Sequence, residues 1–249
     1  EPLRDAEAIA ALDASAVVAR VAPILETVAR VRAGLAAEAP RTTLIGFAGG
    51  CFTVACYMLE GRGSKEFAAA RGLAYADPAL FGRLIRTLQD ATVEYLVAQV
   101  EAGAEALMLF DSWAGMLSPG QFRRWVIEPT AAITRALRRR CPGIPLIGFP
   151  RLAGPLLTDY AARAGVDATA IDTAMDPRWS AQAVPPTMAL QGNLDPLALV
   201  AGGAALEAEA RSILAAMRGR PYVFNLGHGI VPQTPPDHVT ALMRILRSA

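Results

Sequence analysis

The chain has 249 residues, of which 53% are hydrophobic and 19% are charged, and its net charge is +1. This length and hydrophobic content predict one large domain with a buried core. A nearly neutral charge excludes the electrostatic footprint of a nucleic-acid-binding protein, and no apolar run is long enough to predict a membrane span. Lys65, the only lysine, lies in the polar segment GRGSKE. Enzymes that form a Schiff base need a buried lysine, so that class is excluded as well.

Helical and strand-like segments alternate along the chain. Apolar residues recur at helical spacing from Val17 to Leu35 and predict a helix over 16–35. Further helices are expected at 52–60, 78–103, 119–140, 154–164 and 236–246, and another begins at 196. Short apolar runs between them predict six strands, at 43–48, 106–110, 145–149, 168–171, 188–191 and 222–225. Arg138, Arg139 and Arg140, which end one helix, are interpreted as a solvated face that complements the helix dipole.

Three cysteines, Cys51, Cys56 and Cys141, are present without CxxC spacing. An odd number of cysteines does not form a complete disulfide framework, and free thiols persist in a reducing compartment. The pattern therefore predicts a cytoplasmic protein whose cysteines are small core residues.

Polar or conformationally special residues follow nearly every predicted strand. They are Asp111, Ser112, Arg151, Asp172, Asn193 and His228. In a parallel α/β barrel the loops after the strands form a ring around the active site, whereas an open sheet gathers its ligand at one switch point. No GxGxxG motif follows a strand, which argues against a dinucleotide site. The distribution therefore favours an α/β fold of the (β/α)8 TIM-barrel type, with His228 in YVFNLGHGI at its mouth.

A (β/α)8 barrel needs eight strands, whereas six βα units are predicted here. Two further strands are therefore expected before Glu1. Residues 1–249 are expected to form a single domain that is the C-terminal majority of the barrel. Because an open sheet exposes two strand edges, this chain alone is expected to be unstable.

Five segments, in order along the chain, resemble the uroporphyrinogen decarboxylase family: LIGFAGGCFTVACYMLEGRGSKEF, LMLFDSWAGMLSP, IGFPR, LQGNLDP and FNLGHGIVPQTPP. The resemblance implies a distorted (β/α)8 barrel that is usually a homodimer. It also implies a lyase of haem biosynthesis, which needs no cofactor. Its substrate is uroporphyrinogen III, and removal of the four acetate carboxyl groups gives coproporphyrinogen III.

The matching motifs imply five site residues. Tyr57, Ser112 and His228 match substrate-contacting positions and are the expected catalytic residues, Phe110 matches an apolar position that lines the macrocycle, and Arg151 matches a basic position. By this resemblance Tyr57 and Ser112 donate hydrogen bonds to the acid side chains, and His228 pairs with a carboxylate. The four polar residues are expected to line one cavity. The alternative roles are structural: a core aromatic for Tyr57 and turn residues for Ser112 and His228.

Two features depart from the family pattern. Thr173 follows Asp172 where many members have tryptophan. The arginine-rich N-terminal motif of the family, and its aspartate that holds the pyrrole nitrogens, have no match in this sequence. The resemblance therefore implies that this chain alone is inactive.

Two other functions stay open at this point. Zinc-dependent corrinoid or thiol methyltransferases share the barrel type but need a His-x-Cys pair and a further cysteine, whereas His228 is followed by Gly229 and Ile230. No metal site is therefore expected. The other alternative is a non-catalytic tetrapyrrole-binding fragment.

Overall fold

Six parallel strands form one sheet in which neighbours in sequence are also neighbours in space, in the order β1-β2-β3-β4-β5-β6. The computed structural model describes residues 2, 3 and 5–248. Its strands are β1 (Ile45–Gly49), β2 (Ala106–Asp111), β3 (Leu146–Pro150), β4 (Ala168–Ala170), β5 (Ala189–Leu194) and β6 (Tyr222–Leu226). A doubly wound sheet reverses its strand order at a switch point, and this sheet does not. The order is therefore that of a (β/α) barrel, as the sequence predicts. The two strands expected before Glu1 lie outside the described residues.

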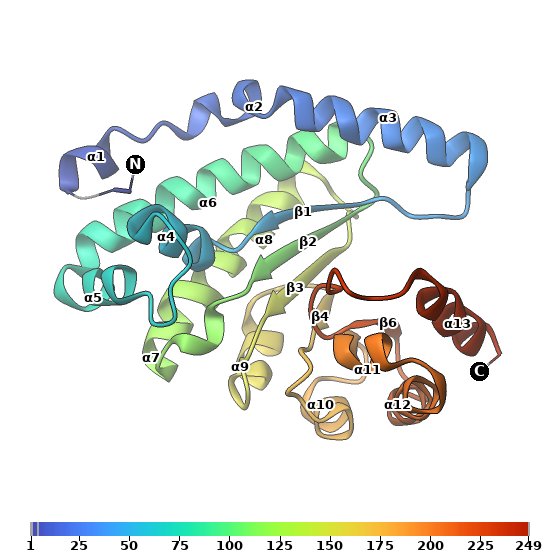
Figure 1. Cartoon of the computed structure of the whole chain (residues 1–249). Coiled ribbons are helices and arrows are strands. Elements are labelled where there is room, and N and C mark those ends of the chain that lie inside the picture. The colour runs from blue at the N-terminus through green and yellow to red at the C-terminus, as the bar shows by residue number, and fades with distance from the viewer. Residues whose placement is uncertain (1, 4, 249) are drawn as a thin grey trace.

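Helices connect the strands and cover the outer face of the sheet, with α6 and α8 beside β1 to β3 and α11 to α13 beside β5 and β6 (Figure 1). The helices are α1 (Ala6–Ala10), α2 (Val17–Arg20), α3 (Ala22–Glu38), α4 (Cys51–Glu60), α5 (Ala68–Ala76), α6 (Pro78–Glu101), α7 (Pro119–Phe122), α8 (Glu128–Arg140), α9 (Leu156–Arg163), α10 (Pro177–Ala183), α11 (Pro196–Ala201), α12 (Gly203–Ala216) and α13 (Pro236–Arg247). A π-helical segment, Arg123–Ile127, joins α7 to α8. No helix in the described part of the chain is both long and apolar enough to cross a membrane.

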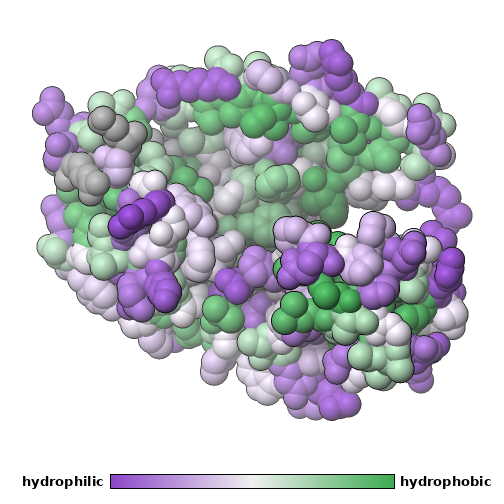
Figure 2. Space-filling view, in the orientation of Figure 1, coloured by the Kyte–Doolittle hydropathy of each residue, from purple (hydrophilic) through white to green (hydrophobic). Residues whose placement is uncertain are grey.

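The buried apolar side chains form two clusters. The larger cluster packs the outer face of the sheet against the helices, and the smaller one lies on the inner face and contains Met108, Ile147, Phe149, Ala168 and Ala170. Side chains of a strand alternate between the two faces, so the outer and inner clusters share the same strands. The inner face opens into a hollow that Figure 2 shows as a largely hydrophobic surface between the upper and lower parts of the molecule.

All six predicted strands are present, and each of their boundaries lies within three residues of the predicted one. The helix predicted over 16–35 is divided at Val21 into α2 and α3, next to Pro23, which lacks an N–H donor. None of the residues of α3 is buried. Helices α1, α5 and α10 were not predicted, because they have only five, nine and seven residues, which give too few turns for a helical repeat to be recognised.

The basic triplet ends α8 at a solvent-accessible surface, as interpreted, and two of its arginines also make specific contacts. Arg138 forms an ion pair with Asp167 at 2.6 Å and donates a hydrogen bond to the carbonyl oxygen of Ile144. Arg140 pairs with Glu94 of α6. These two arginines therefore connect α8 to neighbouring elements, although the partly exposed pairs each contribute little to stability.

Candidate functional site at the carboxyl ends of the strands

The predicted site residues gather at one end of the sheet. Ser112 follows the last residue of β2, Arg151 follows the last residue of β3, and His228 comes two residues after β6. Because the strands are parallel, their carboxyl ends lie at the same edge. In barrel enzymes this is the end that carries the active site.

A cavity of about 300 Å³ opens at this end of the inner face. Its apolar walls come from alternate residues of the central strands and from the loop after β6, and its polar groups come from β5, β6 and that loop. The lining residues are Met108, Phe110, Phe149, Ala170, Gln191, Asn225, Leu226, His228, Gly229 and Ile230. A cavity with mostly apolar walls and a few polar groups suits an organic ligand.

The cavity contains two of the five predicted site residues, Phe110 and His228. Phe110 packs edge-to-face against Phe149, with ring centroids 6.0 Å apart. The other three predicted residues, Tyr57, Ser112 and Arg151, lie at the same end of the sheet but are not among the residues that line this cavity.

The charges of Arg151 and Asp172 both act on the imidazole of His228. Its partial enclosure lowers the pKa of the imidazole, the nearby Arg151 guanidinium lowers it further, and Asp172 acts in the opposite direction. A lowered pKa favours the neutral imidazole, which can donate one hydrogen bond and accept another. Neutral His228 beside Arg151 supplies a donor next to a permanent positive charge, which is a pairing suited to an anionic ligand.

The turn that carries Arg151 is held by three backbone hydrogen bonds. The Arg151 N–H donates to the carbonyl oxygen of Asp111 at 3.2 Å, and the Arg151 carbonyl accepts from the N–H of Gly115 at 3.0 Å. Leu152, which has a left-handed φ of 58°, donates its N–H to Oδ2 of the buried Asp172 at 2.7 Å. A left-handed leucine costs free energy, and the neighbouring contacts hold it in place.

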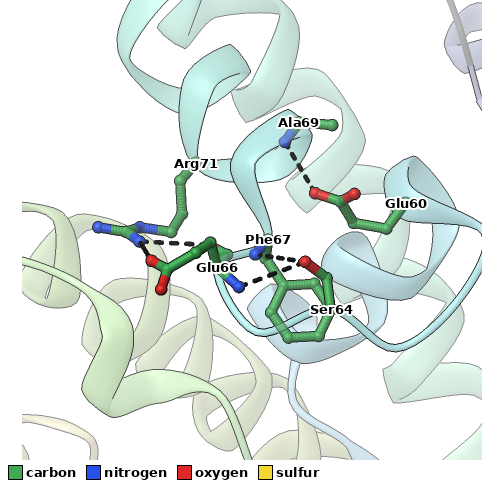
Figure 3. Close-up of polar contacts among 6 residues, drawn as sticks. All are labelled: Glu60, Ser64, Glu66, Phe67, Ala69 and Arg71. Atoms are coloured by element: carbon green, nitrogen blue, oxygen red, sulfur yellow. Dashed lines mark hydrogen bonds and ion pairs between the residues drawn. The ribbon is translucent and has the colours of Figure 1, made fainter.

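Tyr57 lies on α4 and packs against the ring of Phe67. Figure 3 shows the polar contacts of the loop that holds Phe67. Phe67 has a left-handed φ of 45°, and its N–H donates to Oγ of Ser64 at 3.0 Å. Glu60 accepts a hydrogen bond from the N–H of Ala69 at 2.7 Å, at the start of α5. The Phe67 ring is fully buried, with its centroid 5.9 Å from that of Tyr57 and 4.8 Å from that of Trp113. The GRGSKEF segment therefore supplies an aromatic support for Tyr57.

The strand-end residues Asp172, Thr173 and Asn193 shape the wall beside His228. Asn193 lies within β5, and its Nδ2 donates to the carbonyl oxygens of Asp172 and Met175 at 3.0 and 2.7 Å. Gly227 passes so close to the backbone of Thr173 that a side chain at Gly227 would collide with it. This close approach explains the glycine before His228.

Sequence reasoning missed several lining residues, chiefly Gln191 and Asn225. Both lie inside strands and face inward, opposite the helices. Every second residue of a strand faces inward, which places Met108 and Phe110 in the cavity and Gln191 and Asn225 as well. This alternation is the sequence signal that could have identified Gln191 and Asn225.

The three cysteines lie in the described part of the chain, where they are buried and form no disulfide. Among residues 2, 3 and 5–248 no group of three or more histidine, cysteine, aspartate or glutamate side chains is placed to hold a metal ion. The described residues therefore do not assemble the zinc ligands that the methyltransferase alternative requires.

The parallel strands follow one another in sequence order across the sheet, and polar side chains lie at their carboxyl ends. This arrangement is that of a (β/α)-barrel enzyme. The chain matches the family model "Uroporphyrinogen decarboxylase (URO-D)" over residues 1–249. It belongs to the uroporphyrinogen decarboxylase family, as the resemblance of its motifs indicates.

Two curated relatives illustrate the match, and both are named uroporphyrinogen decarboxylase. The relative from Granulibacter bethesdensis is 59% identical over 237 residues, which cover 95% of this chain and 69% of the relative. The relative from Gluconacetobacter diazotrophicus is 55% identical over 252 residues, which cover 98% of this chain and 71% of the relative. A solved structure, a methyltransferase from Methanosarcina mazei, is similar in fold, with a TM-score of 0.78, 22% identity and coverage of 92% of this chain and 64% of its own.

Proposed function

We propose that this protein is a carboxy-lyase of haem biosynthesis that removes the four acetate carboxyl groups of uroporphyrinogen III and yields coproporphyrinogen III without a cofactor. Family membership supports this function. The structural observation that carries it is the apolar cavity at the strand ends, with His228 in its lining and Arg151 close to that imidazole. The apolar walls suit the faces of pyrrole rings, and the side chains of His228 and Arg151 suit the acid groups that the rings carry.

The chemistry needs both kinds of surface. A pyrrole acetate loses CO2 when a ring carbon is protonated, because the electrons of the broken C–C bond then enter the ring. A second proton must afterwards reach the exocyclic carbon, which becomes a methyl group, and the ring carbon then releases the first proton so that the pyrrole is restored. In the proposed assignment Arg151 orients a substrate carboxylate, and His228, Tyr57 and Ser112 donate hydrogen bonds to acid side chains. Phe110 packs against the macrocycle.

The test is decarboxylation of uroporphyrinogen by the complete gene product, with the oxidised products separated by chromatography. We expect Arg151→Gln to raise KM at least roughly tenfold, because a charge-assisted contact to a carboxylate is lost. Arg139→Gln, an exposed change on α8, is the matched control and leaves KM unaltered. An unchanged KM in the Arg151 variant would contradict the assignment, and tetrapyrrole binding without turnover would favour the non-catalytic alternative.

The proposal includes a cytoplasmic homodimer. The buried free cysteines support a reducing compartment. Exposed apolar side chains at the site end of the sheet, Tyr57, Leu152 and Ile230, support a protein contact there. Light scattering of the complete gene product tests the dimer, since Leu152→Asp and Ile230→Asp together should give monomers.

The proposal also assigns residues 1–249 to the C-terminal majority of one barrel domain. Three inward side chains of the two outer strands, Ile45, Phe47 and Val223, support this, because they are apolar and exposed. We expect residues 1–249 expressed alone to bind an apolar dye and to lack decarboxylase activity. A cooperatively melting chain that works at the rate of the complete gene product would contradict this assignment.

A further inference from the structure

Asp111, the last residue of β2, is buried beneath the first turn of α4. Its Oδ1 accepts two hydrogen bonds from Thr53, one from the backbone N–H at 3.2 Å and one from the hydroxyl at 2.6 Å. Thr53 is the third residue of α4, so its N–H has no partner within the helix. The carboxylate of a neighbouring strand therefore caps this helix.

Gly50 makes this approach possible. A Cβ atom at Gly50 would lie 2.5 Å from Oδ2 of Asp111, which is closer than van der Waals contact allows. The backbone N–H of Gly50 also donates to the carbonyl oxygen of Phe110 at 2.8 Å. The start of α4 and the end of β2 are thus in direct contact through both backbone and side chain.

The hydrogen bonds continue from Thr53 to the peptide bond that follows Ser112. Oγ1 of Thr53 accepts from the N–H of Trp113 at 3.2 Å. The single hydroxyl proton of Thr53 points to Asp111, so its lone pair is available to Trp113. The hydroxyl therefore ties α4 to the segment that bears Ser112.

Tyr57 lies four residues after Thr53, on the same face of α4. Its ring packs against Trp113 with centroids 6.4 Å apart. Helix α4 thus contacts Trp113 at two points, through the Thr53 hydroxyl and through the Tyr57 ring. Neither Asp111 nor Thr53 is among the residues that line the cavity.

We propose that Asp111 and Thr53 are positioning residues that fix the spacing between Tyr57 and Ser112 by holding the start of α4 against the end of β2. The inference deepens the proposed function and rests on it, since it gives these two residues their purpose in binding the acid side chains of the substrate. A purely structural role for the same contacts would change stability without a specific effect on Tyr57.

The kinetic test is a double-mutant cycle in the complete gene product. Thr53→Val removes the hydroxyl and keeps the shape, and we expect kcat/KM for uroporphyrinogen to fall roughly tenfold. Thr53→Ser keeps the hydroxyl and should restore kcat/KM to within about twofold. In a Tyr57→Phe background Thr53→Val should lower kcat/KM less than about twofold, because the group being positioned is already absent. If Thr53→Val does not fold, Thr53→Ala provides the same comparison.

The matched control is Thr134→Val on α8. Thr134 is also buried, and its hydroxyl donates to the carbonyl oxygen of Thr130 at 2.9 Å, far along the chain from the site. This control should leave kcat/KM unchanged even if it lowers the melting temperature. The proposal is overturned if Thr53→Val acts equally with and without the Tyr57 hydroxyl, or if Thr53→Ser fails to restore activity.

A second measurement does not depend on activity. In protein labelled with 5-fluorotryptophan, Trp113, Trp125 and Trp179 each give one fluorine resonance, assigned by single changes to phenylalanine. We expect Thr53→Val to move the Trp113 resonance alone and Thr53→Ser to return it. If the protein lacks decarboxylase activity but the Trp113 resonance responds in this way, the proposed function fails while the positioning contact stands. If the resonance does not move, the positioning contact itself is wrong.

Discussion

The residues of the central strands and those of the outer strands differ in their exposure to solvent. In β3 and β4 every residue is buried, whereas β1 and β6 have residues that alternate between exposed and more buried positions. The exposed side chains of the outer strands include Ile45, Phe47 and Val223, which are 42%, 58% and 45% exposed. They face the same hollow as the central cluster.

This difference is unusual for parallel strands, which are ordinarily buried on both faces. Ile45, Phe47 and Val223 are as apolar as the inward residues of the central strands, although they are exposed, and among the residues of the two outer strands only Asn225 of β6 adds a polar side chain to the inner face. The central strands carry the stability of the described sheet, and the outer strands carry the two edges at which the fold is open.

The largest expected effect compares two phenylalanines that both pack edge-to-face on Phe110. Phe149 of β3 is buried, and Phe47 of β1 is mostly exposed. We expect Phe149→Ala to lower the free energy of unfolding by about 3–5 kcal/mol and Phe47→Ala by less than about 1 kcal/mol, because only the first leaves a cavity. Urea denaturation of residues 1–249 provides the comparison, with the losses taken from the shifts of the unfolding midpoint, although this chain is expected to be less stable than the complete gene product. Equal losses would show that the two regions do not differ energetically.

The second prediction concerns Asp111, the buried carboxyl group at the end of central strand β2. Burial raises the pKa of Asp111 to about 6, against the hydrogen bonds from Thr53, which lower it. As the pH falls through this pKa, the folded protein takes up a proton that the unfolded chain does not yet bind, so the contribution of this group to stability rises. Between about pH 7.5 and about pH 5 the gain is on the order of 1–2 kcal/mol.

The measurement is the pH dependence of urea unfolding, compared with Asp111→Asn, which removes the titration. The variant should lack this gain, so the stability difference between the two proteins should change in favour of the wild type at the lower pH. A difference that stays constant, or changes in the opposite direction, would contradict the raised pKa.

The same contrast explains what could be predicted from the sequence. The strands are short apolar runs bounded by turn residues, so all six were found and their parallel order followed from the alternating helices. The positions of Arg151 and His228 at the carboxyl end of the sheet could be predicted, because Arg151 directly follows a strand and His228 comes two residues after one. The helices around the site were harder, since α5 and α10 depend on tertiary packing more than on periodicity.

The role of Asp111 was also out of reach, because it depends on contact with Thr53, which is distant in sequence. A strand-end carboxylate looks the same in a sequence whether it faces a ligand or caps a helix, as Asp111 does. Likewise, nothing in the runs TLIGFA and YVFN distinguishes outer strands from central ones, since both are apolar. Exposure of a strand depends on its neighbours, which the local sequence does not contain.

A third prediction concerns a titratable group at the open edge. His228, after outer strand β6, has a lowered pKa because of its partial enclosure and because of Arg151. We expect Arg151→Gln to raise the pKa of His228, since a neighbouring positive charge is removed. Proton NMR titration of the His228 ring measures the change, with Arg139→Gln as the control. A fall in pKa would show that Arg151 does not lie near the imidazole.

The smallest expected effect is at Val223, where threonine reports whether water reaches the inner face of β6. Threonine differs from valine by a hydroxyl group, which costs free energy only where it is removed from water without a hydrogen-bond partner. In residues 1–249 Val223→Thr should change the free energy of unfolding by no more than about 0.5 kcal/mol, whereas Ile147→Thr on central strand β3 should cost more than about 2 kcal/mol. The same pair of variants in the complete gene product sharpens the comparison. If Val223 is covered there, its substitution should cost about 1–3 kcal/mol, and an unchanged small cost would show that the edge stays open to water.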